Sequence, residues 1–128
     1  MKSLFLAALF CILGTVAAKA QWFANYTSCD VTIQQICVNT NPCQKVPGPV
    51  IVLTAGSVIP VPFTPCSTTQ ETMYLVCWVN CPNICTAVSV SQPQICGVPY
   101  VGQLGPCGTG CGPATVATDP TTGTVKIY

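Results

Sequence analysis

Short stretches in which β-branched or aromatic residues alternate with polar ones recur along the chain, separated by Pro or Gly. Because successive side chains of a strand point to opposite faces, such stretches are typical of β-strands. No apolar period of about 3.6 residues is sustained, and Pro recurs too often for a helix of more than about two or three turns. The sequence therefore predicts an all-β fold with short strands, hairpins and much irregular loop. The expected strands cover residues 31–33, 50–53, 73–79, 87–90, 115–118 and 124–128.

Turn-forming residues lie between these strands. Residues 119–123, Asp-Pro-Thr-Thr-Gly, place Pro early and Gly late, as the loop of a β-hairpin requires, so residues 115–128 are expected to form a hairpin. Pro47-Gly48-Pro49 and Ala55-Gly56-Ser57 are expected to bracket the second strand. Residues 59–65 have Pro at alternate positions, and each Pro removes a backbone donor. This segment is therefore predicted to be an edge strand or a polyproline-like stretch.

The first twenty residues have the pattern of a secretory signal peptide. Lys2 precedes an apolar run from Leu4 to Val16, and Ala18-Lys19-Ala20 offers the small residues that signal peptidase recognises. The run is shorter than the roughly 20 residues that a membrane-spanning helix needs. We therefore expect residues 1–20 to be cleaved, residues 21–128 to form one domain, and the protein to be secreted without membrane insertion.

Cysteines are the dominant chemical feature of the expected mature chain. The full chain has 11, and ten remain once the signal and its Cys11 are removed. An even number in a short secreted chain predicts five disulfides, whose connectivity stays open among about 945 pairings. A thiolate metal cluster is disfavoured because C-x-C and C-x-x-C steps are absent. The expected disulfide cysteines are Cys29, Cys37, Cys43, Cys66, Cys77, Cys81, Cys85, Cys96, Cys107 and Cys111.

One internal repeat is visible in the cysteine spacing. The pattern C-x10-C-x3-C that starts at Cys66 recurs from Cys96, whereas the other side chains match poorly. Residues 63–92 and 93–122 are therefore candidates for two copies of one disulfide-linked unit.

Charged side chains are scarce: four are basic, three are acidic, and His is absent. Without a basic patch the chain is not expected to bind nucleic acid. Without His, a nucleophile lacks its usual base, and Asp30, Glu71 and Asp119 are isolated in sequence, so we expect no enzymatic activity. The same three acids do not form a calcium-binding motif. No cofactor or metal is expected.

The closest cluster of cysteines spans residues 77–85 and reads C-x3-C-P-x2-C. This pattern, with the total of ten cysteines, resembles part of the trypsin-inhibitor-like cysteine-rich family. The resemblance implies a secreted five-disulfide module that presents a protease-binding loop. The chain departs from that family because its cysteines are more widely spaced and no C-x-C step occurs. No Lys or Arg lies between Cys85 and Cys111, so a target protease would need an apolar specificity pocket.

Asn25-Tyr26-Thr27 is an acceptor sequon for N-glycosylation. Because it lies near the expected mature N-terminus, Asn25 is predicted to be exposed and glycosylated.

Some aromatic residues could contact a sugar ring or a partner. Aromatic residues in strands are more often part of the core, and we expect this for Tyr74 and Trp78. Trp22 and Phe23 precede the first disulfide cysteine and stay open, as does Tyr26.

Many cysteines combined with few charges indicate a protein that associates readily and lasts in an oxidising environment. The composition is similar to that of proteins from invertebrate shells, cuticles and egg coats. We therefore predict a non-enzymatic structural protein of an extracellular matrix, including the mineralised kind. Its expected partners are other matrix components or further copies of itself. The alternative is a secreted binding module, such as a protease inhibitor or a host-directed effector.

Overall fold

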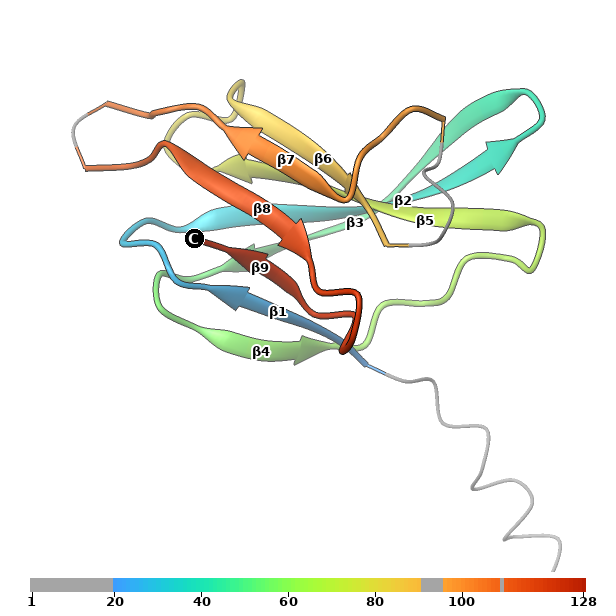
Figure 1. The fold of residues 1–128 in the computed structure, drawn as a ribbon, viewed down its shortest axis with the longest axis horizontal. Coiled ribbons are helices and arrows are strands. Elements are labelled where there is room, and N and C mark those ends of the chain that lie inside the picture. Colours follow the sequence, from blue (N-terminus) through green and yellow to red (C-terminus); the bar gives the residue numbers. More distant parts are fainter. Residues whose placement is uncertain (1–19, 91–95, 109) are drawn as a thin grey trace, which may run out of the picture.

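A computed structural model of the chain describes residues 20–90, 96–108 and 110–128, and these residues form nine strands in two sheets (Figure 1). No helix long and apolar enough to span a membrane occurs in these ranges. The predicted signal segment lies, apart from Ala20, outside the described residues. The strands are β1 (Gln21–Asn25), β2 (Val31–Thr40), β3 (Cys43–Leu53), β4 (Val58–Val61), β5 (Gln70–Trp78), β6 (Cys85–Ser89), β7 (Val101–Leu104), β8 (Ala114–Thr118) and β9 (Val125–Ile127).

The two sheets pack face to face. The first, called sheet A here, has the strand order β4-β1-β9-β8-β7, and the second, sheet B, has the order β3-β2-β5-β6. All neighbouring strands are antiparallel except β1 and β9, which run parallel. In Figure 1 sheet A lies in front of sheet B. The predicted fold class, a small all-β domain with five disulfides, is confirmed.

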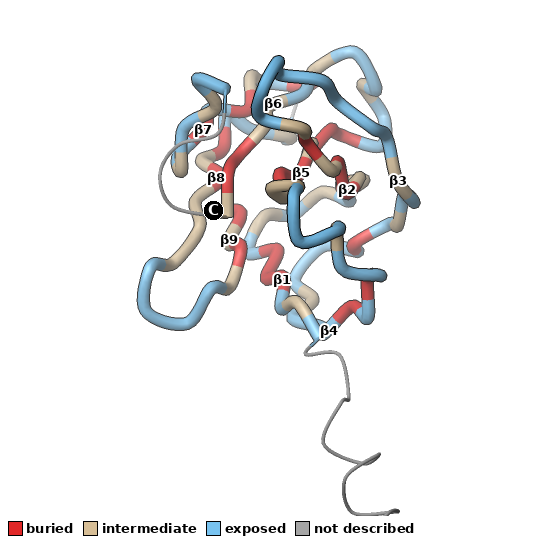
Figure 2. Tube along the Cα trace, turned by 90° about the vertical axis from the view of Figure 1, so that its right-hand side faces the viewer, coloured by how far each residue is buried: buried red, intermediate tan, exposed pale blue. Residues whose placement is uncertain are grey.

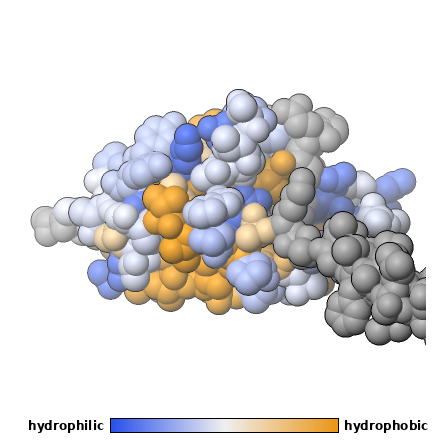
Figure 3. Space-filling model, turned by 90° about the horizontal axis from the view of Figure 1, so that it is seen from below, coloured by the Kyte–Doolittle hydropathy of each residue, from blue (hydrophilic) through white to orange (hydrophobic). Residues whose placement is uncertain are grey.

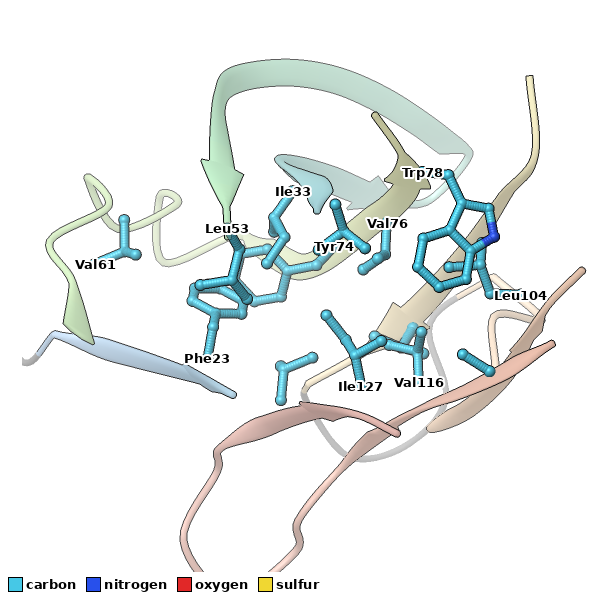
Figure 4. Packing of buried hydrophobic residues seen from close by; sticks show 14 of the residues in the cluster. Phe23, Ile33, Leu53, Val61, Tyr74, Val76, Trp78, Leu104, Val116 and Ile127 are labelled. Atoms are coloured by element: carbon cyan, nitrogen blue, oxygen red, sulfur yellow. The ribbon is translucent and has the colours of Figure 1, made fainter. Parts of the chain in front are cut away.

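The core lies between the sheets, where the inward-facing residues of both meet (Figure 4). Phe23 from sheet A packs edge-on against Tyr74 from sheet B, with ring centroids 5.0 Å apart, and against Phe63, 5.9 Å away. Burial raises the pKa of Tyr74 to about 12. Trp78 is also fully buried, and its Nε1 donates to the carbonyl of Gly105 at 2.7 Å. The predicted core positions of Tyr74 and Trp78 are confirmed.

The β8–β9 hairpin is present as the turn residues predicted. Asp119 and Thr124 close the loop through an N–H···O bond of 2.8 Å, and Gly123 adopts φ +74°, which favours glycine. The Asp119 carboxylate accepts from the amide of Thr121 at 2.8 Å and pairs with Lys126 Nζ at 3.1 Å. These contacts, the amide first, lower the pKa of Asp119.

Prolines occur within two edge strands, β3 and β4. The prediction that Pro47-Gly48-Pro49 forms a turn is wrong: these residues lie within β3, an edge strand, at an irregularity where Gly48 and Pro49 together face the single β2 residue Gln35. Edge strands tolerate Pro because one side of their backbone has no ladder partner. Of the segment predicted over residues 59–65, the first three residues belong to the edge strand β4, which contains Pro60 and pairs with β1, and residues 62–65 lie outside the strands.

Two strands, β1 and β7, were not expected from the pattern. Within β7, Gly102 packs so closely on β6 that a Cβ there would overlap the hydroxyl of Thr86. The proposed repeat over residues 63–92 and 93–122 places β5 and β6 in sheet B and β7 and β8 in sheet A. It stays a prediction.

Candidate interaction surface

Five disulfides join the ten cysteines of the described residues. The bridge between Cys29 and Cys111 spans 82 positions and encloses the other four along the sequence. Since bridges of this number in a small chain are typical of oxidising compartments, the protein is compatible with an extracellular location. The remaining pairs are Cys37–Cys66, Cys43–Cys96, Cys77–Cys85 and Cys81–Cys107.

The sequon residue Asn25 is fully buried, so the expectation that it is exposed is wrong. Its Nδ2 donates to the carbonyls of Cys29 at 2.9 Å and of Leu53 and Thr54 at 3.3 Å. Its Oδ1 accepts from the amide of Thr27 at 3.0 Å and from the Thr27 hydroxyl at 2.6 Å. A glycan on Nδ2 would displace donor contacts that this fold uses, so glycosylation of Asn25 stays a prediction that its burial does not favour.

The loop between β5 and β6 is the segment that resembles a protease inhibitor. Cys77–Cys85 closes its base and Cys81 ties it to Cys107. Its tip is a tight turn in which the amide of Ile84 donates to the carbonyl of Cys81 at 2.9 Å. A peptide that binds by strand addition must be extended, and this turn is not. The loop geometry therefore does not favour protease inhibition.

Asp30 and Asp119 are each held by local contacts. Asp30 accepts from the amide of Ala55 at 2.8 Å, and Asp119 is held by its turn and by Lys126. Asp119 also borders a hollow of about 390 Å³ that includes Tyr100 and Val101. A lowered pKa keeps Asp119 ionised, whereas a general acid or base works best with a pKa near the operating pH. No group of three or more metal-ligating side chains occurs among the described residues.

Sheet edges β3 and β4 border the same side of the sandwich, away from β7 (Figure 2). Most of their residues are exposed. Seen from below, this side carries a broad band of apolar side chains (Figure 3). We call the exposed large apolar residues of β3 and β4 the open-edge patch; they are Val46, Val50, Val52, Val58 and Ile59.

The open-edge patch has few charges that would repel another copy of the chain. Lys45 is the one charged residue in β3 and β4. Natural edge strands usually avoid pairing with other chains through charges, prolines or bulges. Here prolines occur at residues 47, 49 and 60, so backbone pairing is restricted while the apolar side chains remain accessible.

The aromatic residues left open by the sequence separate into two groups. Phe23 belongs to the core, whereas Trp22 is 48% and Tyr26 is 60% exposed. Comparisons of the chain with protein-family models, curated proteins and solved structures found no significant match.

Proposed function

We propose that the protein is a secreted, non-enzymatic structural component of an extracellular matrix, in which copies associate through the open-edge patch. The observation that carries this proposal is the exposed apolar band on β3 and β4. Apolar patches on the surface of soluble proteins commonly mark interaction sites. The disulfides support a role that requires persistence outside the cell. The same role would hold in a mineralised matrix.

The expected association is weak and depends on concentration. Val50, Val52, Val58 and Ile59 are roughly half exposed, so covering each contributes on the order of 1 kcal/mol. Two copies together gain about 8 kcal/mol, against an association cost of about 4 kcal/mol or more. The net gain of about 4 kcal/mol corresponds to a dissociation constant of about 1 mM. Such contacts hold copies together at the high concentrations of a matrix and release them in dilute solution.

Sedimentation velocity over a concentration series tests this proposal. The full chain, secreted by a eukaryotic host and recovered oxidised, should show an average mass that rises with concentration at neutral pH. The double variant Val50→Lys, Val52→Lys should remain monomeric, because the added charges lie on the same face of β3 and repel across the contact. Val101→Lys is the matched control, since Val101 is 51% exposed on the distant strand β7 and should leave association unchanged.

Two results would contradict the proposal. One is a wild-type chain that stays monomeric at millimolar concentration. The other is recovery of the native protein entirely in the freely soluble fraction of its source, without reductant or denaturant.

A further inference from the structure

The outer face of sheet A, which points away from the core, carries three exposed aromatic side chains. Phe23 and Asn25 are fully buried, so alternation places Trp22 of β1, and Tyr26 directly after the end of β1, on the opposite face of the sheet. Ile127 is likewise buried, which places the following residue, Tyr128, on that outer face. We call Trp22, Tyr26 and Tyr128 the aromatic face; they are 48%, 60% and 59% exposed.

The aromatic side chains lie at two positions along the strand direction, Trp22 at one and Tyr26 with Tyr128 at the other. Trp22 and Tyr26 are four residues apart, which corresponds to about 13 Å along a strand. The amide of Tyr26 donates to the carbonyl of Ile127 at 2.8 Å, extending the parallel pairing in which Asn25 lies beside Ile127. Tyr26 and Tyr128, which directly follow β1 and β9, are therefore neighbours about 5 Å apart at the backbone. One tryptophan and one tyrosine pair thus lie on the outer surface of sheet A, the sheet that lies in front in Figure 1.

The electrostatics of this face favour an uncharged partner. Among the strands of sheet A, Lys126 is the one charged residue, and its ammonium group is neutralised by Asp119 at 3.1 Å. The polar neighbours are uncharged: Gln103 and Thr115 lie on the outer face of β7 and β8 and share a hydrogen bond of 3.2 Å. Such side chains can exchange hydrogen bonds with hydroxyl groups but offer no charge to an anion.

We propose that the aromatic face binds an uncharged β-linked polysaccharide that lies along β1. The flat rings of such a polymer present C–H groups on their faces and hydroxyls at their rims. The C–H groups suit the electron-rich faces of Trp22, Tyr26 and Tyr128, and the hydroxyls suit the amide and hydroxyl groups nearby. This proposal names a matrix partner for the function proposed above. It does not require self-association, because the aromatic face and the open-edge patch share no residue.

Depletion assays with insoluble chitin and with crystalline cellulose test the proposal on the full chain, secreted and oxidised. We expect the polymers to remove the protein from solution, with little change between low salt and about 0.5 M salt because no ion pairs are involved. Trp22→Ala and the double variant Tyr26→Ala, Tyr128→Ala should each weaken binding about tenfold or more. The matched variant Tyr26→Phe, Tyr128→Phe keeps both rings and should bind within about twofold of wild type.

The variants of the open-edge patch separate this proposal from the previous one. Val50→Lys with Val52→Lys, both on β3 of sheet B, should abolish self-association and leave polysaccharide binding intact. Near-ultraviolet circular dichroism checks that each variant keeps its folded core. The proposal is overturned if neither polymer depletes the wild-type chain, or if the alanine variants bind as well as wild type. Binding confined to an anionic polysaccharide such as heparin, or lost at 0.5 M salt, would also overturn it.

Discussion

The buried side chain of Asn25 makes the strongest prediction about stability. Asn25→Ala removes the donor for three backbone carbonyls and the acceptor for Thr27. A buried group left without a partner costs about 1–3 kcal/mol. The contact with Leu53 is buried, whereas those with Cys29 and Thr54 are partly buried and can recover some hydration. We expect a total loss of about 3 kcal/mol in the free energy of unfolding.

Equilibrium unfolding in guanidinium chloride, followed by tryptophan fluorescence with disulfides intact, measures this loss. With a denaturant slope of about 3 kcal/mol per molar, the midpoint should fall by about 1 M. Asn83→Ala is the matched control, because Asn83 is an exposed asparagine in the β5–β6 loop and should change stability by less than about 0.5 kcal/mol. A loss below about 1 kcal/mol for Asn25→Ala would refute the hydrogen-bond reasoning.

The burial of Asn25 also predicts that this residue carries no N-linked glycan in the folded protein. The secreted, folded protein should have the intact mass of a chain without a glycan on Asn25, because Nδ2 is enclosed by three carbonyls. A secreted protein with native circular dichroism and a glycan mapped to Asn25 would show that the fold accommodates the modification.

Three further predictions concern the core, the bridges and the sheet edges. The pKa of Tyr74 is raised from 10.0 to about 12, so as the pH rises the unfolded chain loses this phenol proton before the folded chain does. The free energy of unfolding should therefore fall by about 3 kcal/mol between pH 10 and pH 12. Thermal unfolding at pH 9 and 12 should show this loss in wild type and not in Tyr74→Phe. Replacing Cys29 and Cys111 by Ala should cost about 3.5 kcal/mol in guanidinium titrations, since the other bridges shorten the ring that this pair closes to roughly 27 residues. Gly102→Ala should destabilise by about 1–3 kcal/mol, whereas Gly105→Ala, whose Cβ would meet only Ile84 at 3.5 Å, should be close to neutral in the same titration.

Local chemistry made part of this fold predictable. The β8–β9 hairpin followed from residues 119–123, because Pro, Gly and an Asp side chain determine a turn without help from distant residues. The cores of β2 and β5 followed from their β-branched and aromatic content.

Features that depend on distant contacts were not predictable. β1 forms only because it lies between β4 and β9, the latter about a hundred residues away in sequence. Pro47 and Pro49 resemble a turn locally, and only the position of β3 at an edge makes them acceptable in a strand.

The interaction surfaces were only partly predictable for the same reason. The sequon at Asn25 describes a recognition pattern for an enzyme and contains no information about burial. The aromatic face needs the parallel pairing of β1 with β9 to bring Tyr26 beside Tyr128. The disulfide pairs, likewise, depend on which cysteines the folded sheets bring together.

The disulfide between Cys29 and Cys111 affects what a protease can remove from the protein. Since it encloses the other four, a single backbone cut anywhere between these two residues leaves both pieces covalently joined. A protease that nicks an exposed loop between Cys29 and Cys111 therefore releases no fragment, and damage within this range must accumulate at two or more places before material is lost.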